Sequence, residues 1–429
     1  MPPRGAFDHA PKLQFVPIMI GEDGSYPAEA NRYLDERCNG EWQLPGEVKS
    51  PKIPTLKSRI DIASRLAIFL GWASLQKKAD WRKYVYQDDI LELYQPDLIS
   101  GTGSPSGRSL SPNTVNLYVG EACLFLAWAA ERGYRSVFKV PTRRTTYVAS
   151  SSTSSAQSVQ EVDQRIGAFS PAETPISVPS NEEVERWLSA VQIRSPIKAM
   201  VFELILRTGL RISEANLMRA TCFPDKIYNG EAAWHPNWIA AGKVPVTIKY
   251  GTKGGKVTPA SELGTRWRTI EVPIDLAERI WHYKAIVRPN LLARSRKSNG
   301  AQLSRTDRLW LGEGKCQPVS NEMLRRIWKS TPHCPPDWHP HIGRHFYAIQ
   351  AVCELTRAHL TLKQLSAAGD ADFGWLHGLL SGQIQLILSP LMGHVSAATT
   401  MHYLRASVAK MARDKGHPSV RWNEMVDAA

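Results

Sequence analysis

The stretch that decides the fold reads Leu206-Arg207-Thr208-Gly209-Leu210-Arg211-Ile212-Ser213-Glu214. The apolar residues before it predict a helix over 199–206, and Gly209 suits the left-handed turn that ends such a helix. Arg211 then opens a second predicted helix. An arginine at that place presents a planar fork that fits a phosphate group, and amides at the helix start add to the positive field. Taken alone, however, the stretch fits a surface ion pair between Arg211 and Glu214 better.

Two further stretches near the C-terminus supply the missing partners. They read His341-Ile342-Gly343-Arg344-His345 and Leu391-Met392-Gly393-His394, and the second is followed nine residues later by Tyr403. His341 and Arg344 are three residues apart, so they point from one face of a helix. Imidazoles exchange protons near neutral pH, and a second arginine can clamp a phosphate.

Attack on a phosphodiester needs a nucleophile, cations on the non-bridging oxygens and a proton donor for the leaving oxygen. A tyrosine hydroxyl, with a pKa of about 10, is a poor nucleophile unless cations surround it. Tyr403 among two arginines and two histidines meets these needs without a metal. A lone tyrosine is usually packing, so the interpretation depends on the other residues.

A metal site is the alternative use of the histidines. His333, Cys334, His339, His341 and His345 lie close together in the sequence, but their spacing matches no zinc finger. We therefore expect no metal and no cofactor.

Composition limits which binding partners and which cellular compartment are expected for this protein. The chain has 429 residues, which is long enough for two or three domains, and a formal net charge of +13. Such a surplus favours a polyanion such as nucleic acid, with solubility alone as the alternative. Six scattered cysteines, no apolar run of about 20 residues and no signal-peptide pattern predict a cytoplasmic protein away from the membrane.

Periodicity divides the chain into five predicted parts. An N-terminal extension of unassigned role, 1–50, contains a possible strand over 13–20 and a short helix over 28–37. A helical domain covers 51–140, a Ser/Thr-rich linker covers 141–177, a second domain covers 178–408, and a tail covers 409–429.

A helical period begins at Thr55, and helix-start signals stand at Ser111-Pro112-Asn113 and at Ser180-Asn181-Glu182-Glu183. In the second domain, residues 244–250 and 269–272 alternate as strands, with Gly251, Gly254 and Gly255 at the turn between them.

The three motifs, in this order, resemble the three boxes of the tyrosine recombinase (phage integrase) family. The resemblance covers 178–408 and extends more weakly to 55–140. It implies an all-α core-binding N-terminal domain that binds DNA, followed by a mixed, mainly α, α+β catalytic domain.

The family also implies a role for each matching residue. Tyr403 would attack the scissile phosphate and become linked to the 3′ phosphate of DNA. Arg211 and Arg344 would bind the phosphate oxygens, His341 would handle proton transfer, and His394 would hydrogen-bond the phosphate.

The family's leaving-group lysine lies in a β-hairpin. Lys253 matches it best, with Lys256 as runner-up, because the segment from 256 to 272 is longer than usual. An extra piece over 356–383 is either packed decoration or a surface for a partner protein.

The expected partners are double-stranded DNA, three further copies of this chain in a homo-tetramer on two DNA sites, and possible accessory proteins. The expected place is the cytoplasm, with the nucleoid, and the expected role is integration or excision of a mobile element. The alternatives are a type IB topoisomerase, a telomere resolvase, an inactive DNA-binding architectural protein and a metal nuclease.

Overall fold

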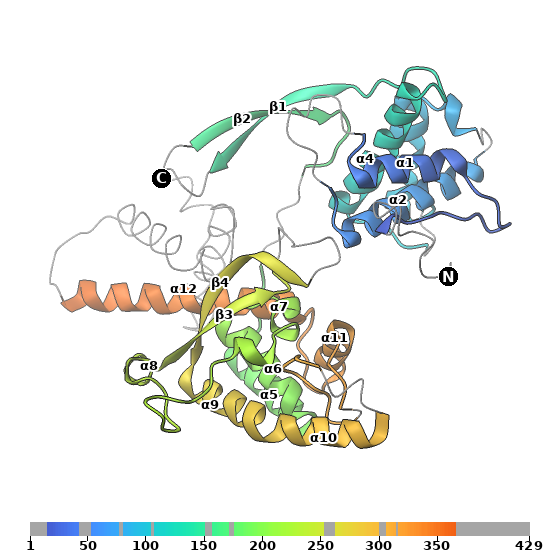
Figure 1. Cartoon of the computed structure of the whole chain (residues 1–429). Coiled ribbons are helices and arrows are strands. Elements are labelled where there is room, and N and C mark those ends of the chain that lie inside the picture. The colour runs from blue at the N-terminus through green and yellow to red at the C-terminus, as the bar shows by residue number, and fades with distance from the viewer. Residues whose placement is uncertain are drawn as a thin grey trace. The chain divides into compact units, whose positions relative to one another are not determined.

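The computed structural model describes residues 15–42, 53–76, 80–103, 107–150, 157–170, 176–252, 262–299, 306–314 and 316–365. The described part is mostly helical with few strands, and the chain divides into two compact units (Figure 1). One unit comprises 1–149 and 159–174, and the other comprises 150–158 and 175–429.

The first unit is built from helices. Its elements are α1 (Ala28–Asn39), α2 (Leu56–Ser74), the 3-10 turn η2 (Trp81–Lys83), the π-helix η3 (Tyr86–Tyr94), α3 (Gln95–Ser100) and α4 (Pro112–Glu131). The predicted starts at Thr55 and Ser111 are confirmed, because each side chain accepts a backbone N–H three residues ahead and satisfies an otherwise unpaired donor.

Helix α1 belongs to the core of this unit. Its Tyr33 is fully buried beside Phe125 and Trp128 of α4, with ring centroids 5.4 Å away in each case. Glu36 accepts a hydrogen bond from the indole N–H of Trp128 at 2.8 Å. The packing therefore continues across residue 51, where the sequence predicts a domain boundary.

The strand that the sequence offered at the N-terminus is not formed in its described part, residues 15–20. The side chain of Asn31 instead accepts the backbone N–H of Met19 at 2.7 Å and donates to its carbonyl at 2.9 Å. These two bonds replace a strand partner at Met19. The short helix expected over 28–37 is confirmed by α1.

The stretch expected as a linker, 141–177, contains two paired strands, β1 (Thr142–Ser150) and β2 (Gln157–Arg165). The N–H of Ile166 donates to Pro141 O at 2.9 Å and closes the base of the pair. The hydroxyl of Tyr86 donates to Ile166 O and accepts from Arg165 at 2.7 Å, which fastens that base to η3. Threonine, tyrosine and valine favour strands even without apolar alternation, so the segment pairs although its pattern predicts a linker.

The second unit has more elements. They are α5 (Asn181–Arg194), α6 (Pro196–Thr208), α7 (Ile212–Asn216), η4 (Ala220–Cys222), α8 (Pro236–Ala241), β3 (Lys243–Tyr250), β4 (Leu263–Pro273), α9 (Ile274–His282), η5 (Tyr283–Val287), α10 (Arg288–Asn299), α11 (Asn321–Ser330) and α12 (Pro340–Leu365). The predicted capping box at Ser180 and Glu183 is present and starts α5.

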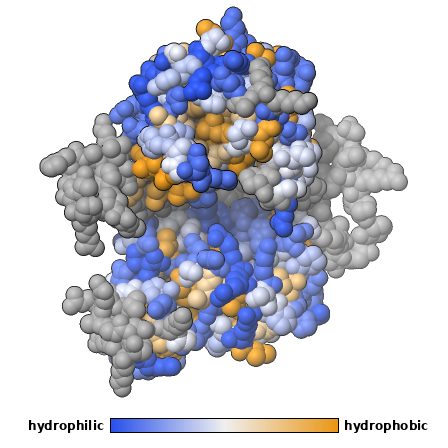
Figure 2. Space-filling view, turned by 90° about the vertical axis from the view of Figure 1, so that its right-hand side faces the viewer, coloured by the Kyte–Doolittle hydropathy of each residue, from blue (hydrophilic) through white to orange (hydrophobic). Residues whose placement is uncertain are grey.

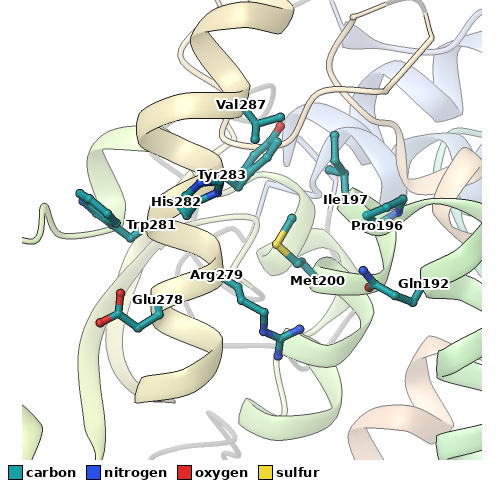
Figure 3. Close-up of a pocket in the computed structure, with 10 residues that line it drawn as sticks. All are labelled: Gln192, Pro196, Ile197, Met200, Glu278, Arg279, Trp281, His282, Tyr283 and Val287. Atoms are coloured by element: carbon teal, nitrogen blue, oxygen red, sulfur yellow. The ribbon is translucent and has the colours of Figure 1, made fainter.

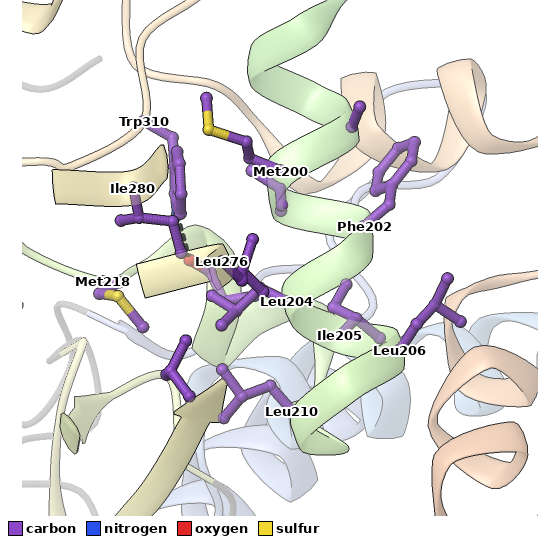
Figure 4. Packing of buried hydrophobic residues seen from close by; sticks show 14 of the residues in the cluster. Met200, Phe202, Leu204, Ile205, Leu206, Leu210, Met218, Leu276, Ile280 and Trp310 are labelled. Atoms are coloured by element: carbon purple, nitrogen blue, oxygen red, sulfur yellow. Dashed lines mark hydrogen bonds between the residues drawn. The ribbon is translucent and has the colours of Figure 1, made fainter. Parts of the chain in front are cut away.

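Helix α6 runs through the core of this unit (Figure 4). Almost all of its residues are buried, and they meet Leu276 and Ile280 of α9 on one side. Gly209 ends the helix with φ of 65°, as the sequence predicts. Trp310 packs into the same core and donates its indole N–H to Ala215 O at 2.8 Å, which ties α7 to it.

Strands β3 and β4 pair antiparallel. Val244 faces Val272 and Val246 faces Ile270, and all four side chains are buried on the inner face of the hairpin. One pair breaks the apolar pattern on this face, because Ile248 faces Arg268. β4 begins six residues earlier than the predicted strand over 269–272.

The surface is mostly hydrophilic on the face that Figure 2 shows, with a patch of hydrophobic residues on the first unit. No helix within the described ranges combines the length and the apolar character that a membrane crossing requires.

Candidate active site

Arg211 lies at the turn between α6 and α7. It is the N-cap residue of α7, and its backbone N–H donates to the Glu214 carboxylate at 2.8 Å. Its guanidinium Nη1 contacts the other carboxylate oxygen at 3.0 Å. The Glu214 side chain is completely buried, whereas that of Arg211 is 24% exposed. The surface ion pair considered as the alternative is thus excluded, because Glu214 lies inside the fold.

Arg268 is the residue that sequence reasoning missed. Its two terminal nitrogens donate to the two carboxylate oxygens of Glu214, each at 2.6 Å. A signal was present in the sequence: Arg268 shares the alternation of Ile270 and Val272, so a charge falls on the inner face of a strand. Such a charge requires a buried partner, although the pattern could not name Glu214.

The pKa of the Glu214 carboxyl reflects this environment. Burial alone would raise the pKa, but the hydrogen bonds and charge of Arg268, followed by those of Arg211, outweigh burial and hold the pKa below its ordinary value. Glu214 is therefore an anion at neutral pH, held by two cations.

Helix α12 carries His341 and Arg344. The Arg344 side chain is buried, 2% exposed, and its Nη1 donates to the carbonyl of Gly209. Gly209 is two residues before Arg211, so the two predicted phosphate-binding arginines converge on the turn between α6 and α7 from distant parts of the sequence.

Gly343 makes this approach possible. A Cβ at this position would lie 2.8 Å from the Trp328 ring and 3.2 Å from Leu206. Only a residue without a side chain lets α12 pack this closely against α6 and α11. The glycine inside the second motif is therefore a packing requirement that positions Arg344.

His341 is exposed at the start of α12. Its ring lies 4.4 Å from that of His345 and 6.4 Å from that of His339, measured between centroids. Burial, and then the nearby charge of Lys329, lower the pKa of His339. Within the described ranges, no group of three or more His, Cys, Asp or Glu side chains is arranged to hold a metal ion.

Lys253, Lys256, His394 and Tyr403 lie outside the described residues. The hairpin arm that leads to Lys253 is described as far as Thr252. On that arm, Gly251 accepts the Ser213 hydroxyl at 3.1 Å, so this end of β3 lies against α7.

The returning arm is fastened at the same place. Glu262, which precedes β4, accepts the N–H of Gly251 on its carbonyl at 2.8 Å. Its carboxylate accepts from Arg219 at 2.5 Å and also from Arg308. Arg219 lies 4.8 Å from the Tyr250 ring centroid. Both ends of the segment 253–261 are thus fixed beside the helix that Arg211 opens.

A separate cavity of about 470 Å³ lies between α5, α6, α9 and η5 (Figure 3). None of Arg211, His341 and Arg344 lines it. Two of its polar lining residues have structural partners: Glu278 accepts from Lys226 at 2.7 Å, and the Tyr283 hydroxyl accepts the Leu311 N–H at 2.9 Å. The cavity is thus distinct from the corner that the motifs form.

The described corner can bind an anion. Arg211, Arg268 and Arg344 contribute three positive charges and Glu214 one negative charge, which leaves a surplus of two beside the start of α7. A phosphate carries the complementary charge.

Three solved structures are similar to this chain. XerH site-specific recombinase bound to a palindromic substrate after cleavage has 14% identity, with 84% of this chain and 79% of that chain covered and a TM-score of 0.46. A lambda integrase dimer bound to a core site has 12% identity, 84% and 90% covered, and a TM-score of 0.41. The Tn1549 transposon integrase in complex with transposon right end DNA has 14% identity, 86% and 95% covered, and a TM-score of 0.44.

No protein-family model matches the chain, and no curated protein matches it. With TM-scores below 0.5 and identities of 12–14%, these similarities carry no conclusion about the role of this chain.

Proposed function

We propose that this chain is a site-specific DNA strand transferase of the tyrosine recombinase type. The observation that carries the proposal is the convergence of two motifs on one turn: Arg344 of α12 donates to Gly209, two residues before Arg211. The third motif supplies the nucleophile, Tyr403.

The proposed reaction balances without water or a metal. The phenolic oxygen of Tyr403 attacks the scissile phosphorus, the bond from phosphorus to the 5′ oxygen breaks, and a 3′-phosphotyrosine forms. Lys253 gives the 5′ oxygen its proton, while His341 accepts the proton that the Tyr403 hydroxyl loses. A 5′ hydroxyl of a second strand then reverses the step, so the energy of the phosphodiester bond is kept.

The remaining groups bind the phosphate. Arg211 and Arg344 compensate the charge that builds up on its non-bridging oxygens, and His394 donates to one of them. Fixed cations in a partly dry site need little reorganisation as the reaction proceeds, which is why such groups often provide the largest share of catalysis.

The partners follow from the same proposal. Double-stranded DNA is the substrate. The core-binding domain is the predicted segment 51–140 together with α1, which packs against it, and the catalytic domain is 178–408. Four copies would act on two sites, with accessory proteins where the element requires them, to integrate or excise a mobile element.

The test traps the intermediate. Sheared DNA from the cell that encodes the chain is incubated with the protein, and covalent complexes are isolated under denaturing conditions. Sequencing their DNA identifies the site, which is then rebuilt as a duplex with a nick next to the cut. We expect wild type to accumulate adduct on this duplex and Tyr403→Phe to form none while still binding it.

The rival functions give other outcomes. An architectural protein would bind DNA without any adduct in wild type. Loss of cleavage on adding EDTA would indicate a metal nuclease. Relaxation of supercoils without exchange between two sites would indicate a type IB topoisomerase, and hairpin ends would indicate a telomere resolvase.

A further inference from the structure

Glu214 lies between two arginines that bind it unequally. Arg268 takes both carboxylate oxygens at 2.6 Å, which is the parallel two-bond geometry of a strong Arg–carboxylate pair. The guanidinium of Arg211 contacts Oε1 at the longer distance of 3.0 Å. Arg268 is therefore the main counter-charge of the buried carboxylate.

This division matters because Glu214 is completely buried. A buried anion attracts cations far more strongly than an exposed one, since little solvent screens it. Without Arg268, the whole negative charge would act on Arg211, which sits on the same turn. A cation that is neutralised by a protein carboxylate attracts a phosphate less strongly.

We propose that Arg268 is a positioning residue that neutralises Glu214 and thereby keeps the charge of Arg211 available to the phosphate. The inference rests on the proposed function for its catalytic consequence. It assigns a specific task to a residue outside the three motifs.

The position of Arg268 gives it a second effect. It lies on the inner face of β4 opposite Ile248, in the hairpin whose loop contains Lys253. Its bonds to Glu214 therefore join that hairpin to α7. One ion pair would fix both the charge of Arg211 and the place of the arm that leads to the proposed proton donor.

A structural role alone makes a different prediction. If Arg268 only fastened the hairpin, then its removal would be equally harmful whatever residue 214 is. If it neutralises Glu214, then removing the carboxylate charge must compensate for its loss. The decisive comparison is between Arg268→Met and the double variant Arg268→Met with Glu214→Gln.

The double variant suits the site. The glutamine carbonyl can still accept the Arg211 backbone N–H, a bond that measures 2.8 Å with Glu214. Its amide nitrogen would then take the place of Oε1, the atom that the Arg211 guanidinium contacts, and an NH2 group cannot accept from a guanidinium. Arg211 thus loses its carboxylate partner and keeps its full charge. Arg279→Met is the matched control, because Arg279 also pairs with a partly buried carboxylate, Glu203, and its described ion pairs are with Glu203 and Asp275. Urea unfolding of each variant verifies that it is folded.

Two readouts separate the inference from the proposed function. The first titrates inorganic phosphate and follows the Nε–H NMR signal of Arg211, assigned by its loss in Arg211→Lys. The second measures the rate of adduct formation on the nicked duplex. We expect Arg268→Met to weaken phosphate binding and to slow adduct formation, each by about tenfold to a hundredfold, as is typical when a residue that supports a functional group from outside is lost.

The double variant should recover most of the lost phosphate affinity and most of the lost rate of adduct formation. Arg279→Met should match wild type in both measurements. A double variant that stays as impaired as Arg268→Met would overturn the inference. If wild type forms no adduct but the phosphate titrations follow the expected order, the proposed function fails and the inference stands.

Discussion

Replacing Gly343 by alanine tests whether the close packing of α12 positions Arg344. The added Cβ would lie 2.8 Å from the ring of Trp328, which is 0.6 Å short of the 3.4 Å at which ordinary contact begins. Trp328 is fully buried, with the rings of Trp187 and Phe202 centred 4.5 and 4.7 Å away, so its ring has little room to move. Helix α12 must therefore shift instead.

Two opposing contributions set the change in the free energy of unfolding. Overpacking of a core costs about 1–3 kcal/mol. Alanine is favoured over glycine within a helix by about 1 kcal/mol. We expect a net loss of about 1 kcal/mol in the free energy of unfolding. The effect on adduct formation should be larger, roughly tenfold, because a shift of about half an ångström moves the neighbouring Arg344 relative to Arg211.

The assay is urea unfolding, followed for each variant in the unit that carries the substitution, together with the rate of adduct formation. Gly120→Ala is the control, because Gly120 lies within α4 and a Cβ there meets nothing within 4 Å. This variant should gain up to about 1 kcal/mol and leave cleavage unchanged. The reasoning is refuted if Gly343→Ala gains stability as the control does and cleaves at the wild-type rate.

Three further predictions concern other structural features of the second unit. Gly251→Ala should cost about 2 kcal/mol or more, because Gly251 has φ of 69° and a Cβ would lie 2.5 Å from Ser213 O; unchanged urea unfolding would contradict this. Ser180→Ala should cost about 1 kcal/mol through loss of the α5 cap, seen as a lower urea midpoint. Folding lowers the pKa of Glu214, so the stability that its carboxylate contributes is complete above the ordinary pKa of 4.5 and is lost as the pH falls through the lowered pKa. The free energy of unfolding of Glu214→Gln should therefore fall less steeply with acid than that of wild type.

Local signals in the sequence predicted helix starts well. Thr55, Ser111 and Ser180 each satisfy a backbone N–H within the next three residues, so the information is contained in a few neighbouring letters. Gly209 is similar, because only its own backbone conformation is at stake.

Long-range pairings were beyond the same reasoning. The first part of β4 was missed because Arg268 interrupts the apolar face, and the reason is its bond to Glu214, 54 residues away. The pairing of β1 with β2 was missed because the segment has no apolar alternation, although its backbone groups still pair.

For the candidate site, the placement of some residues can be compared with the structure, whereas their roles cannot. The sequence motifs predicted that Arg211 and Arg344 serve one phosphate, and the described contacts bring both to the turn at Gly209. His341 and Arg344 lie on one helix, α12, but His341 is exposed at its start whereas Arg344 is buried. The roles of these residues, and those of Lys253, His394 and Tyr403, stay predictions.

The most direct measurement is the identity of the residue that becomes linked to DNA. Wild-type protein is trapped on the nicked duplex, digested with protease and nuclease, and the nucleotide-bearing peptide is sequenced by mass spectrometry. The account predicts a nucleotide on the oxygen of Tyr403, and strongly reduced yield in Arg211→Ala and Arg344→Ala. A nucleotide on any other residue, or undiminished yield in both arginine variants, would contradict it.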